Sequence, residues 1–151
     1  ISWIDWSLLE KNKDLFEFFK FMIDYRKKHP VIRKKLDNAV CGMEAMHAHD
    51  VNAERMEVPQ NAKTLAVSFA GYDRKKGKDD LVYVAVNAYW EEVKITLPNL
   101  TNHGAWYLSV DTYGDEKGKN FYQEGEEIRI DREYVMKPRS IVVFTGREIL
   151  R

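Results

Sequence analysis

The sequence predicts a mainly β protein: an antiparallel Greek-key β-sandwich preceded by one amphipathic helix. Two observations predict this class. Apolar residues between Asn12 and Lys28 recur with a helical period, and no Gly or Pro interrupts them. After Asn38 the period changes to two and stays there to the end, with polar, Gly-containing turn segments between short apolar runs. About eight short strands in ~110 residues are typical of a sandwich.

The helix is expected to begin after Asn12 as N-cap and to stop before Pro30. Basic residues at positions 26–28 suit the negative end of its dipole. At about 100° per residue its apolar positions sweep roughly 220°, whereas a helix on one sheet needs an apolar face of little more than about 100°. We therefore interpret the helix as wedged between two layers, of which the chain supplies only one.

The expected strands are separated by turn residues. They are Met43 to Val51, Thr64 to Ala70, Leu81 to Ala88, Glu92 to Leu97, Trp106 to Thr112, Glu127 to Ile130, Tyr134 to Met136 and Ser140 to Thr145. The runs 81–86 and 141–144 are continuously apolar, which indicates strands in the middle of a sheet. The polar stretches 73–80 and 114–120 are expected to be mobile hairpin or loop tips.

Composition excludes several classes of partner. With 24 basic and 24 acidic residues spread along 151 positions, the chain lacks the basic surface of a nucleic-acid binder or of a protein that binds anionic membranes. It contains no apolar stretch of membrane-spanning length and no signal peptide. One cysteine, Cys41, suits a reducing compartment, so we expect a cytoplasmic protein. The missing initiator Met suggests a mature or excised segment.

Metal and nucleophile sites are weakly supported. His47 and His49 would share one strand face, but no third ligand is evident, and His on a solvated strand is ordinary. Cys41 is expected to be buried and inert. Carboxylates such as Asp79, Asp80 and the pair at 126–127 lie at strand ends or beside Gly, where we expect solvation and an ordinary pKa. We therefore predict no metal, no cofactor and no catalytic residue in this chain.

Several aromatic residues could stack on sugar rings. The alternative is structural: Trp106 would be a core residue, and Tyr89 with Trp90, at a strand end, would pack at a domain boundary. Trp3 and Trp6, three residues apart around Asp5, would anchor the entry to the helix.

Two motifs near the start of the chain are similar to the end of the catalytic barrel in bacterial glycogen-debranching enzymes and isoamylases. These belong to the α-amylase superfamily, glycoside hydrolase family 13. The motifs are the segment Ile1–Trp6 (Ile-Ser-Trp-Ile-Asp-Trp) and Tyr25–Val31 (Tyr-Arg-Lys-Lys-His-Pro-Val). Weaker matches follow in the family's order: 65–69, 84–90, 97–98, Trp106 with 111–112, and 134–144. The stretch 52–60 departs from the family's pattern, so no ligand role is carried over to that connection.

The resemblance implies a domain organisation. Residues 1–36 would be the terminal segment and last helix of a truncated (β/α)8 barrel, and residues 37–151 the C-terminal sandwich. In the family the catalytic carboxylates lie on earlier barrel strands, so none is carried over to this chain. Trp3, Asp5 and Trp6 match the segment after the eighth strand and would help to shape a glucan subsite.

Three functional hypotheses remain open. The first is the C-terminal part of an α-1,6-glucan debranching hydrolase of the isoamylase or pullulanase type, which supports the catalytic barrel and is inactive alone. The second is a carbohydrate-binding module that binds α-glucan through Trp90 and neighbouring aromatics. The third is a homodimer formed through the side of the helix that would face the barrel and is left exposed in this chain.

Overall fold

The computed structural model describes residues 3–53, 58–101 and 104–148. The elements are α1 (Leu8–Lys11), α2 (Lys13–Lys28), the 3-10 helix η1 (Pro30–Ile32), β1 (Met46–His49), β2 (Thr64–Asp73), β3 (Lys78–Asn87), β4 (Val93–Thr96), β5 (Gly104–Asp111), β6 (Ile128–Ile130), β7 (Glu133–Met136) and β8 (Ser140–Glu148). Every expected strand is present, with ends that differ by a few residues. The mainly β, antiparallel fold class is confirmed.

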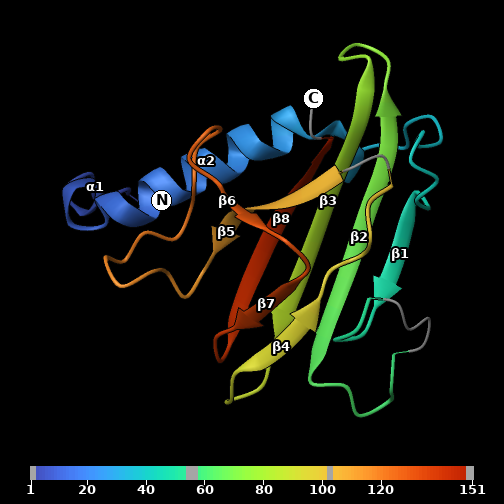
Figure 1. Ribbon diagram of the computed structural model, residues 1–151. Coiled ribbons are helices and arrows are strands. Elements are labelled where there is room, and N and C mark those ends of the chain that lie inside the picture. Colours follow the sequence, from blue (N-terminus) through green and yellow to red (C-terminus); the bar gives the residue numbers. More distant parts are fainter. Residues whose placement is uncertain (1–2, 54–57, 102–103, 149–151) are drawn as a thin grey trace.

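The strands form two sheets of unequal size (Figure 1). The larger has the order β1-β2-β3-β8-β5-β6, and the smaller pairs β4 with β7. All strand pairs are antiparallel. The two continuously apolar runs became β3 and β8, the central strands of the large sheet, as their composition predicts.

The main core lies between the two sheets. Its largest fully buried side chains are Trp106, Tyr83, Phe144, Ile95, Leu97 and Met136. Trp106 is therefore a core residue, and its indole N–H is satisfied by the Pro98 carbonyl at 2.7 Å. Burying this side chain without a hydrogen-bond acceptor would be costly.

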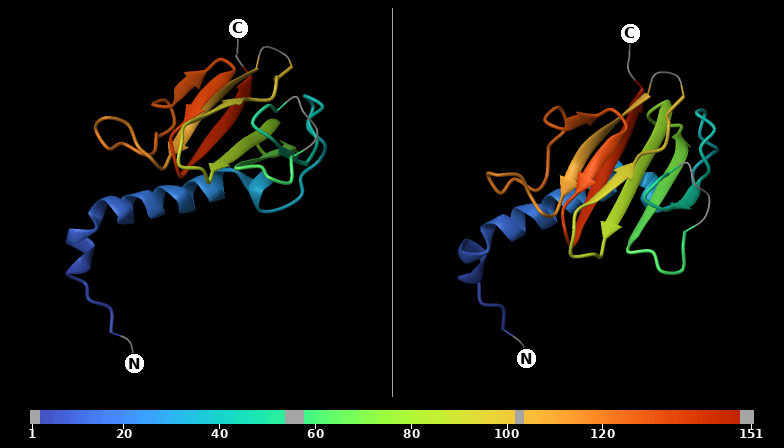
Figure 2. Two further views of the ribbon diagram at one scale, coloured as in Figure 1. Left: turned by 90° about the horizontal axis from the view of Figure 1, so that it is seen from below. Right: turned by 60° about the horizontal axis from the view of Figure 1, so that its bottom comes forward.

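A second core lies on the opposite face of the large sheet, under α2. Phe21 and Tyr25 of the helix pack with Val31, Val82, Val110 and Val143. Phe121, from the loop after β5, stacks on Phe21 with ring centroids 4.6 Å apart. Figure 2 shows that only the C-terminal part of α2 lies along the sheet, while its N-terminal part and α1 extend past the sheet edge.

Helix α2 begins after Asn12, as expected, with Asn12 as its N-cap residue. The Asn12 side chain makes no capping hydrogen bond to α2, because its amide donates to the Leu8 carbonyl in the short helix α1. The stretch 73–80 contains the expected hairpin tip, but the tip is shorter than the stretch, because β2 runs to Asp73 and β3 begins at Lys78. The four residues between these strands form the turn, which Gly77 supports with a φ of 66°.

No helix in the described part of the chain is long and apolar enough to cross a membrane.

Candidate functional site

Helix α2 carries two apolar faces, and the chain covers only one of them. Phe21 and Tyr25 are buried against the sheet, whereas Phe19 is 59% and Ile23 54% exposed. Leu15 and Phe16 are also exposed. An exposed helix surface of this composition is unusual, because a helix that packs on one sheet is normally polar on the side away from the core. Leu15, Phe16, Phe19 and Ile23 are called the bare helix face below.

The large sheet has an apolar surface on the same side as α2. The register places Leu65, Val86 and Ile141 side by side across β2, β3 and β8. Leu65 and Ile141 are exposed, and the next row toward the helix, Val67, Val84 and Val143, is more buried. Exposure thus rises with distance from α2 along this face. The bare helix face and this outer row make an extended apolar surface on one side of the domain.

Polar contacts hold the C-terminal end of α2 on the sheet. The Tyr25 hydroxyl and the Thr145 hydroxyl are 2.8 Å apart, and the Ser109 hydroxyl lies 2.8 Å from Thr145. Burial raises the pKa of Tyr25 well above its usual range, so the phenol stays protonated. Just past the helix, the Asp80 carboxylate meets His29 Nδ1 at 2.6 Å and accepts the Val31 N–H at 3.1 Å. These contacts fix the helix direction relative to the sheet.

The expectation that the carboxylates at strand ends are solvated was wrong for several residues. Asp80 is buried by its contacts with residues 29–31. The Glu127 side chain is only 5% exposed and pairs with Arg147. Asp79 accepts the backbone N–H groups of Val40 and Cys41. Each carboxylate is engaged in holding the fold.

The N-terminal aromatics do not anchor the helix, contrary to expectation. Trp3 is 91% and Trp6 73% exposed, and the segment that carries them extends away from the sheet (Figure 2). Asp5 accepts the backbone N–H and the hydroxyl of Ser7, and these hydrogen bonds lower the pKa of Asp5. A glucan subsite at Trp3, Asp5 and Trp6 stays a prediction.

Trp90 lies at the opposite end of β3 from the β2–β3 turn and is 66% exposed. Its ring packs on Tyr89 with centroids 4.2 Å apart, and the Lys63 ammonium lies 3.6 Å from the centre of the Tyr89 ring. In the described chain the Trp90 ring contacts Tyr89 and Lys63. The structure therefore does not bring Trp90 together with Trp3 and Trp6.

The histidine pair has protein partners. His49 Nε2 lies 2.9 Å from the Ser68 hydroxyl and Nδ1 lies 3.2 Å from the Ala53 carbonyl, while His47 pairs with Glu44. Within the described ranges, no group of three or more His, Cys, Asp or Glu could hold a metal ion. Cys41 is half-buried, and burial raises the pKa of its thiol.

Comparisons with known proteins identify the fold and the family. Residues 39–145 match the family model described as isoamylase, C-terminal. The curated isoamylase 3, chloroplastic, of Oryza sativa subsp. japonica is 27% identical over 113 residues, which are 74% of this chain and 13% of the rice protein. The chain therefore spans about an eighth of the length of this relative.

A solved structure extends the likeness to the helix. Pullulanase type I of Bacillus subtilis str. 168, crystallised with maltose, matches with a TM-score of 0.60 at 19% identity, over 93% of this chain and 17% of that chain. Residues 39–151 make up only about three quarters of the chain, so the structural match includes much of the N-terminal part. These matches, and above all the family model, show that the chain belongs to the isoamylase C-terminal domain family.

Proposed function

We propose that this chain is the C-terminal part of an α-1,6-glucan debranching glycoside hydrolase. Residues 1–36 would complete the catalytic (β/α)8 barrel, and residues 37–151 would support it. The parent enzyme would cleave branch points by double displacement through a covalent glycosyl-enzyme. The names of the two matched proteins, an isoamylase and a pullulanase, support a debranching parent.

The bare helix face is the observation that carries this proposal. Phe19 and Ile23 expose large apolar surfaces on the same helix whose other side is packed on the sheet. Burying apolar side chains of this size stabilises an assembly by roughly 1.5–3 kcal/mol each. A barrel packed on this face and on the outer row Leu65, Val86 and Ile141 would bury both surfaces together.

The chemistry of the described residues supports inactivity of the fragment. A retaining glycosidase needs two carboxyl groups about 5–5.5 Å apart, one of them free to attack the sugar. Three of the buried carboxylates, Asp80, Asp111 and Glu127, accept hydrogen bonds from His29, Tyr134 and Arg147 respectively. Because these three are engaged in the fold, they are not available as nucleophile and acid.

The test uses the parent enzyme and the fragment in parallel. In the parent, Phe19→Asp combined with Ile23→Asp should lower thermal stability and the release of reducing sugar from pullulan. Lys20→Ala with Lys27→Ala, on the polar side of the same helix, should change neither by much. The isolated chain should release no reducing sugar from pullulan or glycogen. Turnover by the chain alone, or an unaffected Phe19 and Ile23 double variant, would refute the proposal.

A specific observation keeps carbohydrate binding as the second candidate. Trp90 is exposed and braced by Tyr89, as a stacking platform for a sugar ring would be. Affinity electrophoresis on glycogen tests it: retardation that Trp90→Ala abolishes supports a binding module, and unretarded migration excludes one.

Self-association is the third possible use of the bare helix face. Light scattering distinguishes self-association from barrel docking. If the isolated chain is a dimer and the Phe19 and Ile23 double variant is a monomer, this face binds a second copy of the chain. The cytoplasmic location and the division at residue 37 remain part of the proposal.

A further inference from the structure

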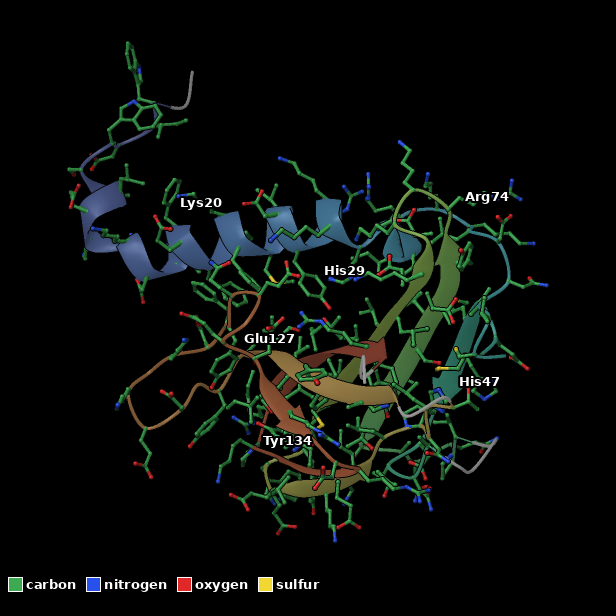
Figure 3. The ribbon with its side chains drawn as sticks, turned by 45° about the horizontal axis from the view of Figure 1, so that its top comes forward. Lys20, His29, His47, Arg74, Glu127 and Tyr134 are labelled. Atoms are coloured by element: carbon green, nitrogen blue, oxygen red, sulfur yellow. The ribbon has the colours of Figure 1, made fainter. Side chains whose placement is uncertain are left out.

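A cavity of about 910 Å³ lies between the polar side of α2 and one end of the large sheet. The helix contributes Glu17, Lys20, Asp24 and Lys28 to its wall, and the opposite wall includes Glu127 and Arg147. Figure 3 shows Lys20 and His29 on the helix side and Glu127 across from them. Its volume falls in the range of small-molecule sites, roughly 300–1,000 Å³.

Three buried hydroxyls line the inner part of this cavity. Tyr25, Ser109 and Thr145 are 6%, 1% and 4% exposed and all belong to its lining. Two hydrogen bonds, each 2.8 Å long, connect them. Three hydroxyls bring three protons and several lone pairs, so two hydrogen bonds leave both donor and acceptor capacity for a ligand. Buried polar groups in native proteins normally have that capacity filled.

The charges around the cavity almost balance. Five basic side chains and six acidic ones line it, and Arg147 with Glu127 and Lys28 with Glu124 already form ion pairs. A balanced lining gives no field that would concentrate anions. Carboxylate and guanidinium groups each present two neighbouring polar atoms, which match a pair of adjacent hydroxyls. The lining also includes the aromatic residues Phe21, Tyr25 and Tyr122, which suit the apolar face of a ring.

The cavity is on a different side of α2 from the bare helix face. Asp24 follows Phe19 by five residues, which places the two side chains roughly 140° apart around the helix. A partner packed on Phe19 and Ile23 therefore has no need to cover the wall that carries Asp24. A ligand site here is independent of the docking proposed above.

We propose that this cavity binds a neutral, polyhydroxylated ligand of about two or three sugar rings, a size that fits its volume. The hydroxyls of Tyr25, Ser109 and Thr145 would hydrogen-bond the innermost ring. Arg147, which uses only part of its five N–H donors on Glu127 and is 31% exposed, would donate to a hydroxyl nearer the entrance. The site is distinct from the exposed aromatic pair Tyr89 and Trp90.

The test is a chemical-shift titration of the 151-residue chain with maltotriose, with inorganic phosphate as the anionic comparison. Asp24→Trp places a large side chain at the cavity wall, and Lys27→Trp is the matched control. Asp24 and Lys27 form one weak ion pair at 3.9 Å, so both variants break the same contact, but only Asp24 lines the cavity. We expect Asp24→Trp to weaken maltotriose binding by about tenfold or more and Lys27→Trp to leave it within about twofold.

A second variant examines the inner hydroxyls. Ser109→Ala removes one of them with little change in volume, and should also weaken maltotriose binding while circular dichroism confirms the fold. The proposal is overturned if maltotriose causes no saturable shifts, if phosphate binds and maltotriose does not, or if both Trp variants weaken binding equally. Loss of binding in Trp90→Ala alone would place the sugar on the aromatic pair and overturn it as well.

Discussion

The imidazole Nδ1 of His29 lies 2.6 Å from Oδ1 of Asp80, and this contact joins the end of α2 to the start of β3. The other carboxylate oxygen accepts the Val31 backbone N–H at 3.1 Å. One buried carboxylate therefore holds both His29, the residue that follows the helix, and the 3-10 turn after it. The direction in which α2 leaves the sheet, and with it the position of the bare helix face, depends on this residue.

We predict that Asp80→Asn destabilises the domain. The amide keeps the size of the side chain but loses the charge that strengthens both hydrogen bonds, and hydrogen bonds to charged groups contribute about 1.5–3 kcal/mol. Urea unfolding should show a lower midpoint by a corresponding amount. Asp131→Asn, at a side chain that is 93% exposed, is the control and should leave the midpoint unchanged. Equal midpoints for wild type and Asp80→Asn would contradict the assigned role.

Removing the buried hydroxyl of Tyr25 should also destabilise the domain, but by less than Asp80→Asn. Tyr25→Phe deletes the hydroxyl that contacts Thr145, and we expect a loss of about 1–2 kcal/mol in the free energy of unfolding. Tyr113→Phe removes an exposed hydroxyl and serves as the matched control. If the two variants unfold at the same urea concentration, the hydroxyl group contributes nothing to holding the helix.

Stability should fall in mild acid because of His49. Burial lowers the pKa of this side chain below its ordinary value of 6.5. The unfolded chain therefore takes up a proton first as the pH falls, and the stabilisation present above pH 6.5 is lost as the pH falls through the lower folded value.

The variant His49→Gln removes this titration and keeps a hydrogen-bonding side chain of similar length. Unfolding free energies measured by urea at several values between pH 7.5 and pH 5 should decrease more steeply for the wild type than for the variant. If the unfolding free energies of the wild type and the variant fall in parallel with pH, His49 does not cause the pH dependence of stability.

The elements were predictable from local patterns, whereas the carboxylate contacts were not. Alternation along 64–70 and the continuous runs at 81–86 and 141–144 identify strands because each residue's face follows from its neighbours. Asp80 and Glu127 were expected to be solvated because each stands at a strand end. Their partners, His29 and Arg147, are 51 and 20 residues away in the sequence, so only the folded topology brings them together.

The two faces of α2 also show what local sequence patterns do not predict. Its 220° apolar arc predicts two packing partners, and the exposure of Phe19 and Ile23 beside the burial of Phe21 agrees with a helix covered on one side only. Periodicity alone does not say which residues meet the sheet. In the structure Phe21 and Tyr25 meet the valines of β3, β5 and β8, and Phe121 stacks on Phe21 from a loop about a hundred residues later in the chain.

Phe21 and Phe19 offer a direct comparison of the two faces, because they are the same residue type two positions apart on one helix. Phe21 is 9% exposed and packs on Phe121, so Phe21→Ala should cost about 3–5 kcal/mol through lost burial and a cavity. Phe19 is 59% exposed, so Phe19→Ala in the isolated chain should cost under about 1 kcal/mol. Both substitutions carry the same small gain in helix propensity, which cancels in the comparison.

Urea unfolding of the two variants measures this difference in stability. Binding of a hydrophobic dye is a second measurement, because Phe19→Ala should lower dye binding by the native chain. A loss of stability as large for Phe19→Ala as for Phe21→Ala would mean that the chain buries both faces itself and leaves no bare helix face for a partner.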